Sequence, residues 1–323
     1  MLQNNLEEFI PIPTMLVSYD CGIKFDVYLR KGRHYLLFAK HGELGVHHKH
    51  RLAEHGVESL YVHSEDISCF EEYIDRNFSG ILQDDGIPIQ ERSKMLYDYS
   101  LILGKHLLQY DQSTFLANSD RVKLEILASH AYEYLSRKNG AVQSVSKLLS
   151  HNYRTYSHCV NVSMYTLILL IDLSYTRQTA KRICAGAFLH DIGKLKVPRH
   201  ILDKRGRLTD EERLEILKHP ADGLALTKDM DLDVLAKDCI IHHHEKLDGS
   251  GYPARAHRIP QHVRIVTMMD IYDALTSNRP YSKPYKPFEA LAIIGKDVEA
   301  GRLDKDLFGR FVRILTDGQI VSS

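Results

Sequence analysis

The sequence predicts an α+β protein in which a small α/β domain precedes an all-helical domain. Residues 23–38 alternate β-branched or aromatic side chains with polar ones on both sides of Lys31-Gly32, which is typical of a β-hairpin. Residues 84–88, with the sequence Asp-Asp-Gly-Ile-Pro, combine turn formers with a proline and indicate a boundary. From about residue 90 onward, apolar residues recur at helical spacing.

The first domain is expected to contain more than the hairpin. A helix from about Lys49 to Gly56, a strand at Glu58–Val62 and a second helix near Ile67–Phe78 complete it. His47, His48 and His50 are expected in a polar turn without a role. The predicted boundaries are 1–88 for the α/β domain, 89–119 for a helical linker and 120–323 for the helical domain.

Composition excludes several classes of protein. The chain has 42 basic and 42 acidic residues, so duplex nucleic acid is not an expected partner. Its five cysteines form no C-x-x-C pair, which argues against a disulfide framework and favours the reducing cytoplasm. The most apolar window, Val160–Leu173, is too short and too interrupted to cross a bilayer, and we expect it to be a core helix.

Histidines and aspartates recur on apolar helix faces in the second half of the chain. His190 and its neighbour Asp191 end an apolar helix that starts near Ala180. His158 lies on the apolar stripe of another helix, because Val162, Tyr165 and Leu169 follow it at intervals of four, three and four. Both histidines are therefore expected to point inward.

Three further segments add donors of the same kind. Thr209–Glu212 resembles a capping box at the start of a helix that runs to His219, where Pro220 discourages continuation. His243 and His244 continue two adjoining apolar rows of the next helix. Asp270 is a carboxylate among apolar residues of a further helix, and a buried carboxylate needs a partner such as a metal ion.

Taken singly, each of these histidines is better explained as an ordinary core or surface residue. Together, five histidines and two aspartates form a nitrogen and oxygen donor set without sulfur, which suits Fe, Mn, Zn or Ni and provides enough ligands for two ions. Two ions about 3.5–4 Å apart can bridge a hydroxide and bind a phosphoryl oxygen. The sequence therefore predicts phosphoester hydrolysis.

The order of the motifs resembles the HD-GYP family over approximately residues 120 to 320. This ordered set is much more specific than the bare His-Asp pair, which occurs in many phosphohydrolases. The matching segments are His190-Asp191-Ile-Gly-Lys194, Lys218-His219-Pro220, His243-His244-Glu245, Asp248-Gly249-Ser-Gly251-Tyr252-Pro253, Asp270-Ile-Tyr-Asp273-Ala-Leu-Thr and Arg279-Pro-Tyr281.

The resemblance implies a helical domain that binds two or three metal ions, often iron or manganese, and hydrolyses cyclic di-GMP to linear pGpG or onward to GMP. Asp191 and Lys194 would be catalytic, with Asp248 and Asp273 in supporting roles. The positions that match the family's metal ligands are His158, His190, Asp191, His219, His243, His244 and Asp270.

The same resemblance assigns substrate contacts. Lys194 would contact the scissile phosphate, Gly251 and Tyr252 would approach the nucleotide, Arg279 would bind a phosphate through its guanidinium group, and Tyr281 would belong to the same substrate site. Family members with a third metal carry a glutamate one helical turn before the first histidine, where this chain has Arg154. We therefore expect two ions, Fe or Mn, and pGpG as the main product.

Two other hypotheses stay open at this point. The chain could be a receptor for a cyclic dinucleotide, or an interaction module that contacts diguanylate cyclases through the Gly251-Tyr252-Pro253 loop, with little turnover. It could also hydrolyse another substrate, such as cyclic GMP-AMP or a simple nucleotide, because the metal site binds phosphate and not base. The sequence leaves open whether the chain forms a homodimer and what signal the first domain senses.

Overall fold

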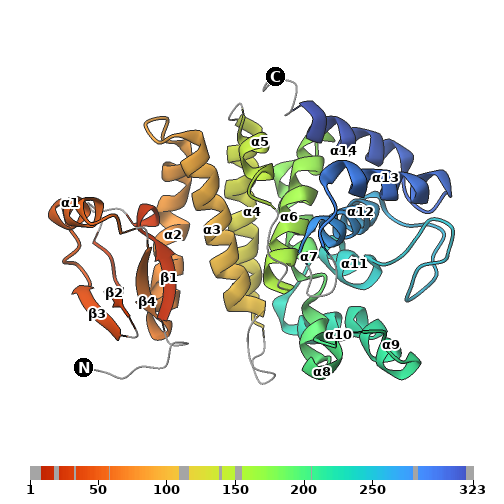
Figure 1. Ribbon diagram of the computed structural model, residues 1–323, viewed down its shortest axis with the longest axis horizontal. Coiled ribbons are helices and arrows are strands. Elements are labelled where there is room, and N and C mark those ends of the chain that lie inside the picture. Colours follow the sequence, from red (N-terminus) through yellow and green to blue (C-terminus); the bar gives the residue numbers. More distant parts are fainter. Residues whose placement is uncertain are drawn as a thin grey trace. The chain divides into compact units, whose positions relative to one another are not determined.

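The computed structural model describes residues 9–17, 22–32, 34–57, 59–108, 116–137, 140–149, 155–204, 206–278 and 283–317. The chain divides into two compact units, residues 1–102 and 103–323, whose elements are labelled in Figure 1. The division falls inside helix α3 (Ile89–Leu108). The first unit contains strands and helices and the described part of the second is helical, so the predicted α+β class is confirmed.

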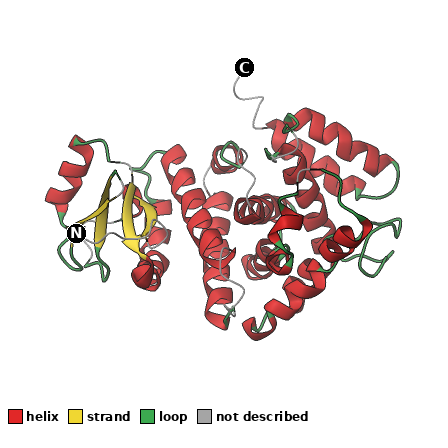
Figure 2. Ribbon diagram, turned by 60° about the horizontal axis from the view of Figure 1, so that its bottom comes forward, coloured by secondary structure: helices red, strands yellow, loops and turns green. Residues whose placement is uncertain are grey.

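The first unit is built on an antiparallel sheet, drawn in yellow in Figure 2. The sheet has four strands in the order β1-β4-β2-β3. The predicted hairpin is confirmed as β2 (Val27–Lys31) and β3 (His34–Ala39), with Lys31 opposite His34. The predicted second strand is β4 (Ser59–His63). Strand β2 also pairs with β4, through Tyr28 and Tyr61.

Strand β1 (Phe9–Pro13) was not predicted from the sequence. It contains two prolines, Pro11 and Pro13, which argue against a strand when the sequence is read alone. In the sheet, β1 pairs only with β4 among the described strands and therefore lies at an edge. An edge strand has one side without ladder hydrogen bonds, so the missing N–H groups of proline are tolerated there.

Helices α1 (Val46–Glu54) and α2 (Ile67–Gln83) complete the first unit, with short 3₁₀ turns η1 (Thr14–Leu16) and η2 (Ser64–Asp66). Helix α2 contacts β4, and its Phe70 ring meets Phe25 edge-on at 5.5 Å between centroids. The three histidines at 47, 48 and 50 lie on α1 and not in a turn, which corrects the expectation. Helix α2 ends at Gln83 and α3 begins at Ile89, so residues 84–88 separate two helices, whereas the two compact units divide between residues 102 and 103.

The described part of the second unit is entirely helical, as predicted. Its helices are α4 (Asn118–Arg137), α5 (Ala141–Ser146), α6 (Thr155–Asp172), α7 (Arg177–Leu189), α8 (Arg199–Leu202), α9 (Asp210–Leu217), α10 (His219–Leu226), α11 (Val234–His242), α12 (Gln261–Thr276), α13 (Pro287–Glu299) and α14 (Lys305–Asp317). Two 3₁₀ turns, η3 (Ile192–Lys196) and η4 (Lys228–Met230), connect them.

Helix α6 forms the centre of this unit. Every residue from Ser157 to Leu170 is buried, because α4, α7, α12 and α14 pack around it. The predicted core helix is confirmed, but it has no solvent-exposed face between Ser157 and Leu170, as is typical of a helix that is enclosed on all sides. No helix within the described ranges combines the length and hydropathy needed to span a bilayer.

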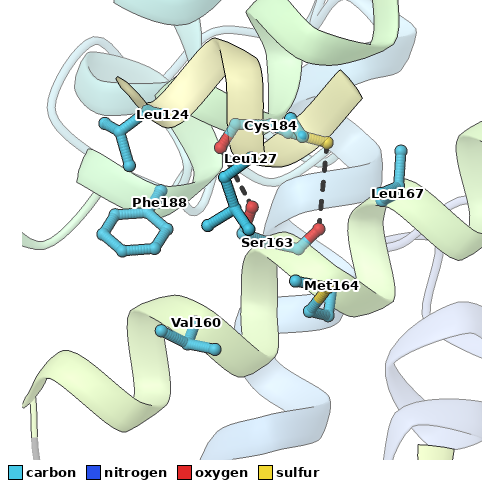
Figure 3. Close-up of a pocket in the computed structure, with 9 residues that line it drawn as sticks. Leu124, Leu127, Val160, Ser163, Met164, Leu167, Cys184 and Phe188 are labelled. Carbon is cyan, nitrogen blue, oxygen red and sulfur yellow. Dashed lines mark hydrogen bonds between the residues drawn. The ribbon is translucent and has the colours of Figure 1, made fainter. Parts of the chain in front are cut away.

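A small cavity lies in the core between α4, α6 and α7 (Figure 3). Its volume is about 10 Å³, and Leu124, Val160 and Phe188 are among its apolar lining residues. The Ser163 hydroxyl in its wall donates a hydrogen bond to the carbonyl of Cys184 at 3.1 Å. The cavity holds at most about one water molecule, so it is not a substrate site.

Candidate metal centre

Two pairs of buried histidines face each other through their Nε2 atoms. The Nε2 atoms of His158 and His190 are 3.2 Å apart, and those of His219 and His243 are also 3.2 Å apart. All four side chains are at most 1 % exposed. These contacts join separate helices, because His158 lies on α6 and His190 follows α7, while His219 starts α10 and His243 follows α11.

The opposite ring nitrogens determine the chemical state of these pairs. Each Nδ1 lies within hydrogen-bond distance of an oxygen that can only accept, so each Nδ1 carries the proton. In the neutral imidazoles the Nε2 atoms of each pair then present lone pairs to each other. The Nδ1 acceptors are Asp273 Oδ2 for His158 at 2.7 Å, Ala187 O for His190 at 2.7 Å, Ile216 O for His219 at 2.7 Å and Ile240 O for His243 at 3.0 Å.

Asp191 lies between the two pairs. Its Oδ2 is 3.5 Å from His158 Nε2 and 3.6 Å from His190 Nε2. Its Oδ1 is 3.3 Å from His219 Nε2 and 3.8 Å from His243 Nε2. This Oδ1 is buried and makes no hydrogen bond among the described residues. A buried carboxylate oxygen surrounded by lone pairs needs a cation, so the donors fit metal ions well.

Asp270, on α12, also extends across both groups. Its Oδ1 lies 3.1 Å from His158 Nε2, and its Oδ2 lies 3.6 Å from His244 Nδ1. The structure therefore brings all seven predicted ligands together. Among the described residues they form two sets whose donor atoms lie within 4.8 Å of one another, Asp191, His219, His243 and His244 in one and His158, His190 and Asp270 in the other.

The position of His219 differs in detail from the expectation. The capping box of Thr209 and Glu212 is confirmed at the start of α9. However, α9 ends at Leu217, and Pro220 lies in the first turn of α10, which His219 itself begins. Proline is favourable in the first turn of a helix, where its missing N–H has no intrahelical partner to lose. Pro220 therefore lies in the first turn of α10, and the helix that it follows, α9, ends three residues earlier.

Burial and charge set the protonation states of the donors. Burial lowers the pKa of His190, His219 and His243, and it lowers the pKa of His244 to about 4. Burial alone would raise the pKa of Asp191, but Lys194 and the surrounding histidines hold this pKa well below its usual range. Neutral imidazoles and an ionised carboxylate are the forms that bind metal ions.

The lowered histidine pKa values predict that the metal-free protein loses stability in acid. An unfolded histidine has a pKa of about 6.5, so below that pH the unfolded chain binds more protons than the folded one. The stability is therefore present above about pH 6.5 and is lost as the pH falls towards the lowered values. Urea titrations should show the free energy of unfolding falling from about pH 6.5 to about 4.5. His244→Gln should flatten this profile, and a profile independent of pH would contradict the prediction.

Asp273 contacts the ring nitrogen of His158 that faces away from the other donors. It is fully buried, and its two oxygens accept hydrogen bonds from His158 Nδ1 at 2.7 Å, Asn161 Nδ2 at 2.8 Å and Ser277 Oγ at 3.1 Å. A carboxylate behind a histidine fixes the tautomer and orientation of the ring. Asn161 was missed from the sequence, although its spacing of three from His158 places both on one helix face.

Replacing Asp273 with asparagine should weaken metal binding by about 10- to 100-fold, because the amide group cannot accept from His158 and Asn161 at once. Competition with a chelator measures this affinity. Asp172→Asn is the matched control, since Asp172 ends the same helix as His158 but pairs with Arg310 at the surface. Unchanged affinity in Asp273→Asn would remove the supporting role.

The sequence profile of a family described as HD domain matches residues 144–307, slightly more than half of the chain. The chain belongs to the HD domain family. Its motif order and its relatives identify it as an HD-GYP protein. The matched range contains all seven donors of the centre.

This HD-GYP chain is similar to several curated proteins. It is 34% identical over 180 residues to a cyclic di-GMP phosphodiesterase of Pseudomonas aeruginosa, covering 55% of this chain and 43% of that protein. It is 33% identical over 161 residues to a 3'3'-cGAMP-specific phosphodiesterase of Vibrio cholerae, covering 49% of this chain and 37% of that protein. The chain thus spans less than half the length of these relatives.

A solved structure shows the same fold. It is an HDG"Y"P protein from Bdellovibrio bacteriovorus, which superimposes with a TM-score of 0.66 and 18% sequence identity. The superposition covers 96% of this HD-GYP chain and 100% of the other.

The remaining predicted residues of the HD-GYP chain lie at different places. Lys194 Nζ is 2.5 Å from Asp191 Oδ2, next to the donors. The Tyr252 ring stacks on His244 at 4.6 Å between centroids. Asp248 is outside the donor sets, since its Oδ1 accepts hydrogen bonds from Ser250 and its Oδ2 faces Arg302 at 3.5 Å. The predictions on Arg154, Arg279 and Tyr281 fall outside the described residues.

Gly251 has a structural reason to be glycine. A Cβ at this position would lie 2.5 Å from the Cα of Glu245 and 2.5 Å from the carbonyl oxygen of His244. The substrate role predicted for Gly251 is not needed to explain the residue. Glu245 itself was missed as a site residue, although it stands in the quoted motif directly after the two histidines.

Proposed function

We propose that this HD-GYP chain is a metal-dependent phosphodiesterase that hydrolyses cyclic di-GMP to linear pGpG. The observation that carries the proposal is the placement of Asp191, with one oxygen towards His158 and His190 and the other towards His219 and His243. A carboxylate placed in this way suits two neighbouring cations. The similarity of the chain to named cyclic di-GMP phosphodiesterases supports the choice of substrate.

Two divalent ions, Fe or Mn, fit the donor set because imidazole nitrogen and carboxylate oxygen are combined without sulfur. His158, His190 and Asp270 would hold one ion, His219, His243 and His244 the other, and Asp191 both. Bound divalent ions supply Lewis acidity and lower the pKa of water. The burial of the histidines keeps the imidazoles neutral and ready to bind.

Lys194 supports the proposal through its contact with Asp191. Its Nζ lies 2.5 Å from Asp191 Oδ2, the oxygen that faces His158 and His190. A cation bound to that oxygen would compete with the ammonium group and release it. The side chain is 20% exposed and can then reach a phosphate oxygen, where its charge offsets the negative charge that accumulates in the transition state.

Tyr252 supports nucleotide binding beside the ions. Its ring lies over His244 with an interplanar angle of 24°, and burial raises its pKa, so it stays a neutral phenol. Aromatic rings stack on nucleobases without strong base selectivity. The same proposal includes four further expectations. The chain contacts diguanylate cyclases through the Gly251-Tyr252-Pro253 loop, and Arg279 and Tyr281 contact the substrate. The protein forms a homodimer and is located in the cytoplasm.

A second candidate is hydrolysis of 3'3'-cGAMP, which is favoured by the similarity to a phosphodiesterase named for that substrate. Metal ions held by the donors would bind phosphate and not base, and a stacking tyrosine accepts guanine and adenine alike. Hydrolysis of cyclic di-GMP and hydrolysis of 3'3'-cGAMP are the same reaction, and the two substrates differ only in one base.

The proposal is tested by anaerobic purification, metal analysis and product chromatography with both cyclic dinucleotides. Fe- or Mn-loaded protein should contain about two ions and convert cyclic di-GMP to pGpG faster than it converts 3'3'-cGAMP. Three ions at full occupancy, or GMP as the first main product, would overturn those parts of the proposal. Binding of the nucleotide without cleavage would show a receptor instead of an enzyme.

A further inference from the structure

Glu245 is a buried carboxylate that the metal centre does not use. It is 1 % exposed and follows His243 and His244 directly. Neither donor set includes it. The cost of burying a charge must be offset by hydrogen bonds or by an ion.

Both carboxylate oxygens of Glu245 accept hydrogen bonds from one loop. The backbone N–H of Ala254 donates to Oε1 at 2.6 Å, and the backbone N–H of Ala256 donates to Oε2 at 3.0 Å. Between them, Arg255 adopts a left-handed conformation with φ of 54°, which is uncommon for a residue other than glycine. The two amides therefore converge on an anion, as in other backbone sites that bind negative charge.

The same loop is packed onto the residues that hold the metal ligands. The Tyr252 N–H donates to the carbonyl of His244 at 3.3 Å, and the Tyr252 ring covers the His244 imidazole. At Gly251 a Cβ would lie 2.5 Å from Lys246 N as well as from the backbone of Glu245. Residues 249–256, which we call the Tyr252 loop, thus contact residues 244–246 through one side chain and through backbone.

We propose that Glu245 is a positioning residue that holds the Tyr252 loop against the His243-His244 turn, so that Tyr252 is in place before the nucleotide binds. The proposal rests on the function proposed above, and it concerns binding of the nucleotide and not the cleavage step. A loop that is already ordered loses less conformational entropy when the substrate binds, so the substrate binds more tightly. Loss of this order should therefore raise KM and leave the reactivity of the ions unchanged.

Glu245→Gln tests the proposal with two substrates. A glutamine has one acceptor oxygen, so its amide N–H₂ would face one of the two backbone N–H groups. With cyclic di-GMP we expect KM to rise at least about tenfold, the effect of losing one charge-assisted hydrogen bond. With bis(p-nitrophenyl) phosphate, whose single rings offer less stacking area than the bicyclic guanine bases, kcat/KM should fall by no more than about threefold, and the metal content should stay within about twofold of wild type.

Two outcomes would overturn the inference. Equal losses on both substrates together with loss of metal would mean that Glu245 serves the metal ions. An unchanged KM for cyclic di-GMP would mean that the loop needs no anchor. Glu299→Gln is the control, because Glu299 is exposed on α13.

Gly251→Ala tests the contact between the Tyr252 loop and residues 244–246 by changing the loop, and it leaves the charge of Glu245 unchanged. Its Cβ would displace the loop from residues 244–246 and should raise KM in the same way. If both variants act by releasing the loop, the double variant should be little worse than either single one, since their effects share one cause. Full additivity would contradict this.

Hydrogen exchange separates this inference from the proposed function. In Glu245→Gln, the amides of Ala254 and Ala256 should exchange faster, whether or not the protein cleaves any cyclic dinucleotide. Protection equal to wild type would overturn the anchoring role. Absence of cleavage by the wild-type protein, with faster exchange in the variant, would reject the proposed function and leave the anchor intact.

Discussion

Replacing Asp191 with asparagine is expected to lower turnover of cyclic di-GMP by roughly a thousandfold or more, as for other residues that act as part of one catalytic unit. The amide keeps the shape of the side chain but exchanges one oxygen for an N–H₂ group that cannot bind a metal ion. Since Asp191 directs one oxygen to each set of histidines, one ion loses a ligand whichever way the amide turns. We expect elemental analysis to show at most about half of the wild-type metal content.

The control for this variant is Asp222→Asn. Asp222 lies on α10 close to the same elements, but its carboxylate pairs with Lys196 at 3.2 Å near the surface. A surface ion pair contributes about 0–1 kcal/mol, so metal content and turnover should not change. If Asp191→Asn retained full metal content and full rate, the proposed arrangement of two ions around this carboxylate would be wrong.

Lys194→Ala is expected to keep the metal ions and to lower kcat by about 10²- to 10³-fold, the usual effect of removing one group that stabilises charge in a transition state. The ammonium group contacts Asp191 Oδ2 in the structure, and metal ions held by the donors would neutralise that carboxylate in its place. The loss should therefore appear in kcat measured by product chromatography, with metal content equal to wild type.

Lys196→Ala provides a closely matched control for Lys194→Ala. Both lysines belong to η3, but Lys196 is 44% exposed and pairs with Asp222. Its removal should leave kcat within about twofold of wild type, because a solvated lysine contributes little to the site. Loss of metal in Lys194→Ala would instead mean that the lysine holds Asp191, and an unchanged kcat would remove its role in catalysis.

Much of the centre could be predicted from residue order because helical periodicity is a local property. His158, His190 and Asp270 recur on apolar faces that the sequence shows directly, and the structure buries them. The pairing of the histidines could not be predicted in this way. His158 and His190 are 32 residues apart, and which of their ring nitrogens meet depends on how α6 packs against α7.

The sequence by itself determined the β2–β3 hairpin, strand β4, the helical character of the second unit and the seven candidate donors, because turn chemistry and apolar spacing act over a few residues. Only the tertiary structure decided that Asp191 lies between two histidine pairs, that both oxygens of Glu245 accept hydrogen bonds from the Tyr252 loop and that a strand with two prolines joins the sheet as β1. These features depend on distances between segments that are far apart in the chain or on loop conformation. Such distances are set by packing, which periodicity does not encode.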